Sequence, residues 1–203
     1  MKKINYFDLG MFDGKEIDMF ITEVGSDYDY NVYGFEAHPK YHQKIKDRFK
    51  DNKRIQCFNY AITDKANSNQ KLKLYMEPTG HGNSIFSTKN NIDINNCVEV
   101  NSISFVNWVK ENIPDYKSCY NILRFNIEGA ELFLINDILE NDFNKHINLY
   151  LGSVPGEDIL KVSELQPYYN DYIQTLKNNS IDILPYCNGL NNISIKSILK
   201  QQL

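Results

Sequence analysis

The residues best suited to chemistry lie in a short turn near the start of the chain. An apolar run passes into Asp8, and glycines follow at positions 10 and 14. Gly10 lets the backbone turn without a Cβ in the way, and Gly14 leaves room for a ligand where a segment of helical spacing begins. Asp8 and Asp13 place carboxylates in and beside this turn, next to its backbone N–H groups. The turn therefore predicts a binding site, although an ordinary strand–turn–helix explains the same letters.

A further acidic residue ends the next predicted strand, residues 31–36. Glu36 lies about 20 residues beyond the glycine turn, where nucleoside-binding α/β folds place a carboxylate that accepts hydrogen bonds from ribose hydroxyls. A third predicted strand ends at Tyr60 and runs into Ala61. The small Ala61 and the amide of Asn59 or Tyr60 suit the edge of an adenine ring. Both strand ends thus predict a nucleoside site, although a solvated glutamate at the first and a plain strand-to-loop passage at the second explain the same residues.

The third group of candidate catalytic residues lies at the end of the strongly apolar run of residues 120–127. Asn126 and Glu128 lie at the expected tip of this central strand. His81 stands between two glycines in a polar loop, where a histidine can titrate near neutral pH and take a proton from a hydroxyl. The plainer alternatives are a solvated loop histidine and acids that complement the positive end of a following helix.

These groups need parallel strands whose carboxyl ends lie side by side. Strand-like runs alternate with segments of helical spacing, which predicts an α/β fold with a mixed sheet of about seven strands. We expect residues 182–184 and 192–199 to form an antiparallel C-terminal hairpin. Residues 77–100 interrupt the alternation, and we expect this insertion to shape the acceptor side of the site. The chain is most simply a single domain, residues 1–203.

Composition and charge argue against several classes of function. The net charge is −4, which does not favour a broad nucleic-acid surface. No run approaches the roughly 18 apolar residues of a membrane span, and no signal-peptide core precedes the first strand. The cysteines at positions 57, 97, 119 and 187 lack zinc spacing and suit reduced thiols. We therefore expect a cytoplasmic protein that acts on a small molecule or glycan, with no nucleic-acid partner, no membrane span and no metal.

Four segments carry a resemblance to a known family. They are residues 8–14 (DLGMFDG), 35–39 (FEAHP), 61–64 (AITD) and 124–131 (RFNIEGAE). In that order they are similar to the DxGANxG turn, the FEPxP segment, the third-strand loop and the KxDxEGxE signature of the FkbM family of S-adenosylmethionine (AdoMet)-dependent methyltransferases. The resemblance covers roughly residues 4–140, and the last segment is the most specific.

The resemblance implies a class I methyltransferase with a Rossmann-like fold and AdoMet as cofactor. It implies transfer of a methyl group to a hydroxyl oxygen, on a sugar of a glycan or glycolipid or on a secondary metabolite. AdoMet has an ammonium and a carboxylate but no phosphate, so the resemblance implies that a carboxylate of Asp8 or Asp13 and the free backbone N–H groups of the turn hold its methionine end. The implied cofactor-binding residues are Asp8, Gly10, Phe12, Asp13, Gly14, Glu36, Ala37, Asn59, Tyr60, Ala61 and Asn126.

The catalytic end departs from the family pattern. Asn126 stands where the family has an aspartate near the methyl group and the acceptor. An amide can position a hydroxyl but cannot take its proton, so Glu128 or His81 would serve as the base if one is needed. Much of the rate acceleration of methyl transfer can come from the alignment of acceptor, methyl group and sulfur.

Two other functions remain open at this point. A catalytically silent AdoMet-binding module is favoured by Asn126, and binding of AdoMet without turnover would identify it. An NAD-linked or nucleotide-sugar enzyme on a Rossmann fold is disfavoured, because the chain has no GxGxxG turn to present a helix N-terminus to a pyrophosphate. A thermal-shift panel of NAD, nucleotide sugars and AdoMet would separate these ligands.

Overall fold

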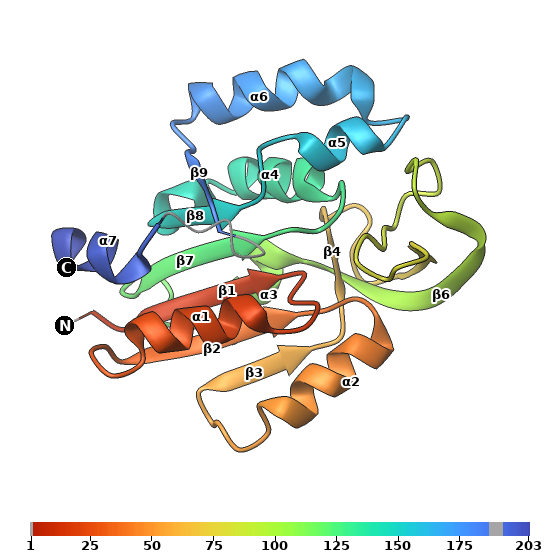
Figure 1. Cartoon of the computed structure of the whole chain (residues 1–203). Coiled ribbons are helices and arrows are strands. Elements are labelled where there is room, and N and C mark those ends of the chain that lie inside the picture. The colour runs from red at the N-terminus through yellow and green to blue at the C-terminus, as the bar shows by residue number, and fades with distance from the viewer. Residues whose placement is uncertain (1, 187–192) are drawn as a thin grey trace.

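The computed structural model describes residues 2–186 and 193–203, and its larger β-sheet has six strands. Their order is β3-β2-β1-β7-β8-β9, and every neighbouring pair is parallel (Figure 1). The strands are β1 (Ile4–Leu9), β2 (Tyr30–Phe35), β3 (Ile55–Phe58), β7 (Tyr120–Phe125), β8 (Leu149–Gly152) and β9 (Ile183–Pro185). Counted along the chain within this sheet, this is the doubly wound 3-2-1-4-5-6 order of the Rossmann fold. The predicted α/β fold is therefore confirmed, and the switch point of the sheet lies between β1 and β7.

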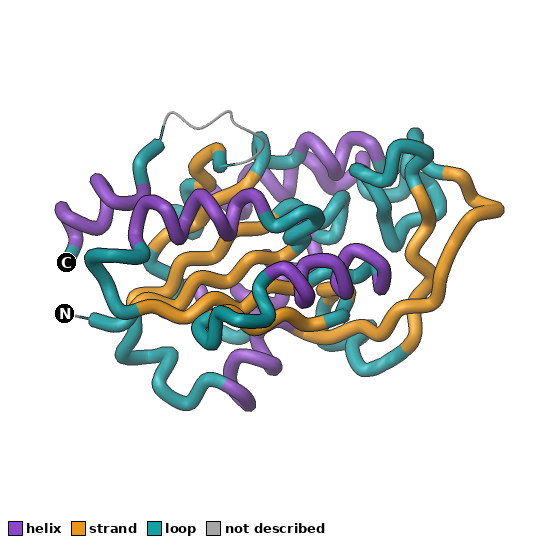
Figure 2. The backbone as a smooth tube through the Cα atoms, turned by 60° about the horizontal axis from the view of Figure 1, so that its bottom comes forward, coloured by secondary structure: helices purple, strands orange, loops and turns teal. Residues whose placement is uncertain are grey.

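Helices cover both faces of this sheet (Figure 2). They are α1 (Lys15–Val24), α2 (Pro39–Arg48), α3 (Phe105–Asn112), α4 (Glu131–Glu140), α5 (Glu157–Lys161), α6 (Tyr169–Asn178) and α7 (Ile195–Gln202), with short 3₁₀ turns at Phe143–His146 and Gln166–Tyr168. Helices α1, α2 and α7 share one buried cluster, which includes Ile17 and Leu199. Helices α3, α4 and α6 share another, which includes Leu134 and Tyr172. Within the described ranges, no helix is long and apolar enough to cross a membrane.

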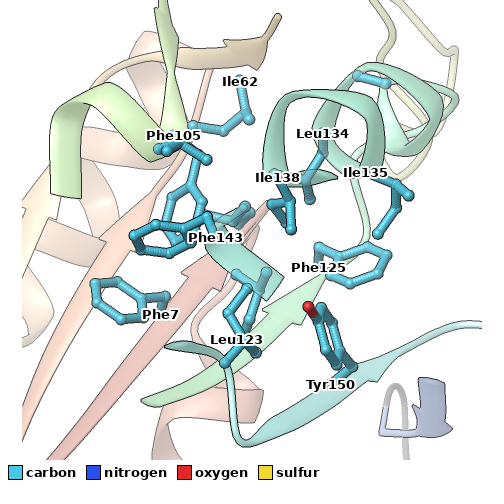
Figure 3. Close-up of a cluster of buried hydrophobic side chains, with 14 of the residues drawn as sticks. Phe7, Ile62, Phe105, Leu123, Phe125, Leu134, Ile135, Ile138, Phe143 and Tyr150 are labelled. Atoms are coloured by element: carbon cyan, nitrogen blue, oxygen red, sulfur yellow. The ribbon is translucent and has the colours of Figure 1, made fainter. Parts of the chain in front are cut away.

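Aromatic side chains fill the core between the sheet and helices α3 and α4 (Figure 3). The ring of Phe105 meets those of Phe7 and Phe143 edge to face, at centroid distances of 5.2 and 6.2 Å. Leu123 and Phe125 of β7 complete this cluster. Burying each such side chain contributes about 1.5–3 kcal/mol, and edge-to-face rings add specific contacts. The core therefore fixes β1 and β7 side by side, with their carboxyl ends adjacent.

A second, three-stranded sheet contains part of the predicted insertion. Its order is β4-β6-β5, with β4 (Ala61–Thr63) parallel and β5 (Lys71–Met76) antiparallel to β6 (Asp93–Ser104). The loop between β5 and β6 folds back toward the large sheet. There the hydroxyl of Ser84 donates a 2.7 Å hydrogen bond to the carbonyl of Glu128. This contact brings the insertion to the tip of β7.

The predicted antiparallel C-terminal hairpin is wrong. Strand β9 is parallel to β8 because helix α6 carries the chain back before β9 begins. The second predicted strand is helix α7, in which Ile195, Ile198 and Leu199 have i, i+3, i+4 spacing. The side chain of Ser194 caps this helix by accepting a hydrogen bond from the backbone N–H of Ser197. The large sheet is consequently all parallel, and residue 192 of the predicted hairpin lies outside the described residues.

Candidate active site

The glycine turn after β1 lies close against the end of β7. Gly10 has a φ of +84°, and a Cβ at this position would lie 2.1 Å from the backbone oxygen of Asn126. Only glycine fits such an approach. Gly14 has a φ of +77° where α1 begins, and its Cβ would lie 2.9 Å from the ring of Phe49. Gly10 therefore shapes the site, whereas Gly14 allows α1 to start and to pack against the chain that follows α2.

Glu36 lies beside this turn, directly after β2. The residue is 8% exposed, and its carboxylate accepts hydrogen bonds from the backbone N–H groups of Phe12 (3.0 Å) and His38 (2.8 Å). Burial raises the pKa of Glu36 to about 7, although the two N–H groups favour the charged form. Asn59 supports the same region, because its amide donates to the carbonyls of Glu36 and Ala37, both at 2.8 Å. The turn, the carboxylate and the start of α2 are thus held together.

Asp8, which was predicted to bind the cofactor, instead forms a buried ion pair next to the glycine turn. Asp8 and Arg124 are direct partners in the β1–β7 register. Nη1 of Arg124 donates to Oδ1 of Asp8 (2.9 Å) and to the carbonyl of Gly10 (2.8 Å), and Nη2 lies 3.5 Å from Oε1 of Glu16. Burial raises the pKa of Asp8 to about 6. Although burial opposes the charge on Arg124, the two carboxylates raise its pKa further above the usual value.

Two of the predicted catalytic residues lie at the tip of β7. The backbone N–H of Asn126 donates to the carbonyl of Leu9 (3.0 Å), which fixes this tip against β1. Glu128 has a left-handed backbone, with a φ of 57°. Its carboxylate is 16% exposed and lies 2.6 Å from Nζ of Lys89. Burial and the charge of Asp158 raise the pKa of Glu128, whereas Lys89 lowers it.

Glu131 closes the turn that follows Glu128. Its carboxylate accepts hydrogen bonds from the backbone N–H groups of Ile127 and Gly129, both at 2.7 Å. Burial raises the pKa of Glu131 to about 7. Because both oxygens are held by this turn, the role of Glu131 is to fix the backbone that presents Glu128.

A cavity at the switch point is lined by most of the predicted site residues. They are Gly10, Phe12, Glu36, Ala37, Tyr60, Ala61, His81, Asn126 and Glu128. Apolar side chains complete the wall, namely Phe35, Ile62, Leu74, Ile85, Ile127 and Ala130. A second cavity shares Gly10, Phe12, His81, Asn126 and Glu128 with the first and has a more polar lining, which includes Asp13. Asp8, Gly14 and Asn59 line neither of these cavities and instead support the surrounding turns.

His81 is exposed at the rim that the two cavities share. Its ring lies 4.6 Å from that of Phe12, which in turn lies 4.9 Å from the ring of Tyr41. Tyr41 also lines the first cavity and was not predicted to belong to the site. Its position in the first turn of the helix after Glu36 is a signal that places it near that strand end. For Lys89 no such local signal exists, because its contact with Glu128 joins distant parts of the chain.

The residues at this site suit an organic ligand. Within residues 2–186 and 193–203, no group of three or more His, Cys, Asp or Glu side chains could hold a metal ion. Cys57, Cys97 and Cys119 are free thiols, and Cys187 lies outside the described residues. A buried acceptor at Glu36, a cavity wall rich in apolar groups and a glycine turn form the kind of concave site that binds small molecules.

Comparisons with known proteins identify the family. The model of the methyltransferase FkbM domain matches residues 8–180. A search of curated proteins gave no match. Among solved structures, the crystal structure of methyltransferase FkbM from Methylobacillus flagellatus KT at 2.20 Å resolution is similar, with 13% identity and a TM-score of 0.46; the match covers 84% of the present chain and 37% of that chain. The present chain thus spans well under half the length of that protein. Since the family model covers most of the sequence, the chain belongs to the FkbM family of methyltransferases.

Proposed function

We propose that the protein transfers a methyl group from AdoMet to a hydroxyl oxygen of a sugar or of a secondary metabolite. The observation that carries this proposal is the position of Glu36. Its buried carboxylate lines the switch-point cavity directly beside the glycine turn. Nucleoside-binding α/β proteins use an acid after the second strand to accept hydrogen bonds from ribose hydroxyls. Family membership supplies the methyl-transfer chemistry.

The chemical character of the lining suits AdoMet. Glu36 would accept hydrogen bonds from the ribose hydroxyls, and Ala61 with its apolar neighbours would pack against the adenine. The backbone at Gly10 and Phe12, with the nearby Asp13, would hold the ammonium and carboxylate of the methionine end. When bound, AdoMet supplies an electrophilic methyl group on a positively charged sulfur. A Cβ at Gly10 would collide with the backbone oxygen of Asn126 at the tip of β7, so the close approach of the turn to this part of the cavity depends on glycine.

The acceptor would enter through the second cavity. Hydrogen-bonding side chains such as Thr79, Asn91 and Ser153 line it, which suits a polyhydroxylated molecule. Asn126 and Glu128 face both cavities. Asn126 would orient the acceptor hydroxyl, and Glu128 would accept its proton as the oxygen attacks. Alignment by these groups supplies a large part of the rate, because it replaces a bimolecular encounter by a fixed geometry.

Calorimetry and a transfer assay test this function directly. We expect AdoMet and S-adenosylhomocysteine to bind to the protein with one-to-one stoichiometry, and we expect label from methyl-labelled AdoMet to appear in at least one compound of a panel of glycans and hydroxylated metabolites. Binding without transfer to any acceptor would support the silent module instead. Absence of binding would remove the enzyme proposal altogether.

Binding should depend on pH through Glu36. The pKa of about 7 means that the carboxyl is largely protonated at pH 6 and charged at pH 8. Ribose hydroxyls donate to the charged form, so below pH 7 a proton must leave before the ligand binds, and affinity should fall by up to about tenfold per pH unit. Titrations with S-adenosylhomocysteine at both pH values measure this effect. The Glu36→Gln variant is the control, since it cannot ionise and should lose most of the dependence; equal affinities of the native protein at both pH values would contradict the assignment.

A further inference from the structure

Lys89 is a fully buried lysine whose charged end reaches the candidate active site. Its side chain is 0% exposed, and Nζ lies 2.6 Å from Oε2 of Glu128 and 2.7 Å from the carbonyl oxygen of Gly82. Lysine is almost never fully buried unless its charge is paired. The ion pair with Glu128 is therefore the feature that makes this position tolerable for a lysine.

Long-range backbone pairing brings Lys89 to this place. Lys89 forms an antiparallel bridge with Val162, and the N–H of Asn90 donates to the carbonyl of Lys161 (2.9 Å). The insertion is thereby joined to the last residue of α5 and to the residue that follows it. Neither contact lies in the large sheet, and together they direct the side chain of Lys89 inward to the tip of β7.

We propose that Lys89 is a positioning residue for methyl transfer, which orients the Glu128 side chain and keeps it as a carboxylate facing the acceptor. This inference rests on the function proposed above, in which Glu128 accepts the proton of the acceptor hydroxyl. Lys89 itself acts through Glu128. Lys89 also donates a hydrogen bond to the carbonyl of Gly82. It therefore fixes the position of the loop next to His81 relative to the carboxylate of Glu128.

The charges around Glu128 make Lys89 the decisive partner. Asp158 and Glu131 face Glu128 with like charge, and Lys161 faces it with opposite charge. Lys161 is held by Asp158 at 2.8 Å and by Glu157 at 2.9 Å, so its charge is largely balanced there. Among the described residues, Lys89 is the cation that forms an ion pair with Glu128. Without it, burial and the neighbouring acids would favour the protonated form of Glu128, which accepts no further proton.

The titration of Glu128 tests this inference without any acceptor. The measurement is ¹³C NMR of protein labelled at the glutamate side-chain carboxyl, with the Glu128 signal identified by its absence in Glu128→Gln. In Lys89→Met we expect the midpoint of this titration to rise by about one to three pH units, as for loss of an adjacent opposite charge. Lys89→Gln retains an N–H donor without the charge and should show a similar rise, so it decides the matter if the methionine variant does not fold. Lys145→Met, at an exposed ion pair with Asp142, is the matched control and should leave the midpoint in place.

Kinetics provides the functional arm of the test. In Lys89→Gln we expect the acid limb of the pH profile of kcat to move upward with the NMR midpoint, while the Kd of S-adenosylhomocysteine stays near that of the native protein. A midpoint unchanged in both Lys89 variants would overturn the role of Lys89 even if the protein binds AdoMet and transfers methyl groups. Failure of the native protein to bind AdoMet would instead overturn the proposed function, whatever the titration shows.

Discussion

Replacing Glu36 by alanine is expected to weaken the binding of S-adenosylhomocysteine by about 100-fold or more. The carboxylate is buried in the wall of the cavity, and the N–H groups of Phe12 and His38 hold it in one orientation. In the proposed function it accepts hydrogen bonds from two ribose hydroxyls, and a hydrogen bond to a charged group contributes about 1.5–3 kcal/mol. Alanine removes those acceptors and also releases the glycine turn. Isothermal titration calorimetry measures the change.

A ligand comparison separates the ribose contact from a general loss of structure. The native protein should bind an S-adenosylhomocysteine analogue without ribose hydroxyls much more weakly than the parent ligand. In Glu36→Ala this difference in affinity should nearly vanish, because the carboxylate that accepts hydrogen bonds from the hydroxyls is absent. Glu99→Ala is the control, since within the described part of the chain this exposed acid of β6 forms an ion pair only with exposed Lys71. Equal discrimination in the native protein and in Glu36→Ala would exclude Glu36 as the ribose acceptor.

The sequence could predict the central part of the site because its signals are local. The apolar runs that form β2 and β7 are followed directly by the polar residues Glu36 and Asn126. Parallel strands bring their carboxyl ends to the same edge of the sheet. Two adjacent strands and one turn are then enough to place these residues around a common cavity, which is where the structure has them. No distant contact had to be known.

Other features depend on contacts between distant segments. Lys89 reaches Glu128 only because residue 89 pairs with Val162, and no pattern in a polar loop encodes that bridge. Helix α7 was expected to be a strand because apolar residues at 195, 198 and 199 suit either structure in a short run; burial of Ile195 and Leu199 in the cluster that contains α1 decides for the helix. The ion pair between Asp8 and Arg124, in contrast, could have been predicted from the sequence. A charge inside a strand buried on both faces needs a partner, and Arg124 is a basic residue inside another strongly apolar run.

Arg124→Met should lower the free energy of unfolding by about 3–5 kcal/mol at pH 8, the usual cost of breaking a buried ion pair. Asp8 is 0% exposed, and Arg124 is its partner in the only salt bridge found for it in the described part of the chain. The variant would leave this carboxylate, and the carbonyl of Gly10, without their donor. Urea unfolding followed by the fluorescence of Trp108, the single tryptophan, measures the change. Lys145→Met, which removes an exposed cation, should change stability by less than about 1 kcal/mol.

The pH dependence and a double variant identify Asp8 as the cause. The pKa of Asp8 in the folded protein, about 6, lies above its ordinary value of 3.8, so the folded state binds more protons between these values and this residue favours folding more as pH falls. Loss of Arg124 raises the pKa of Asp8 further, and the deficit of Arg124→Met should therefore shrink between pH 8 and about pH 5. The double variant Asp8→Leu/Arg124→Met removes both charges and should recover much of the lost stability, since apolar replacement of a buried pair is often neutral. A single variant as stable as the native protein at pH 8, or a double variant no better than the single one, would show that this ion pair does not hold the glycine turn.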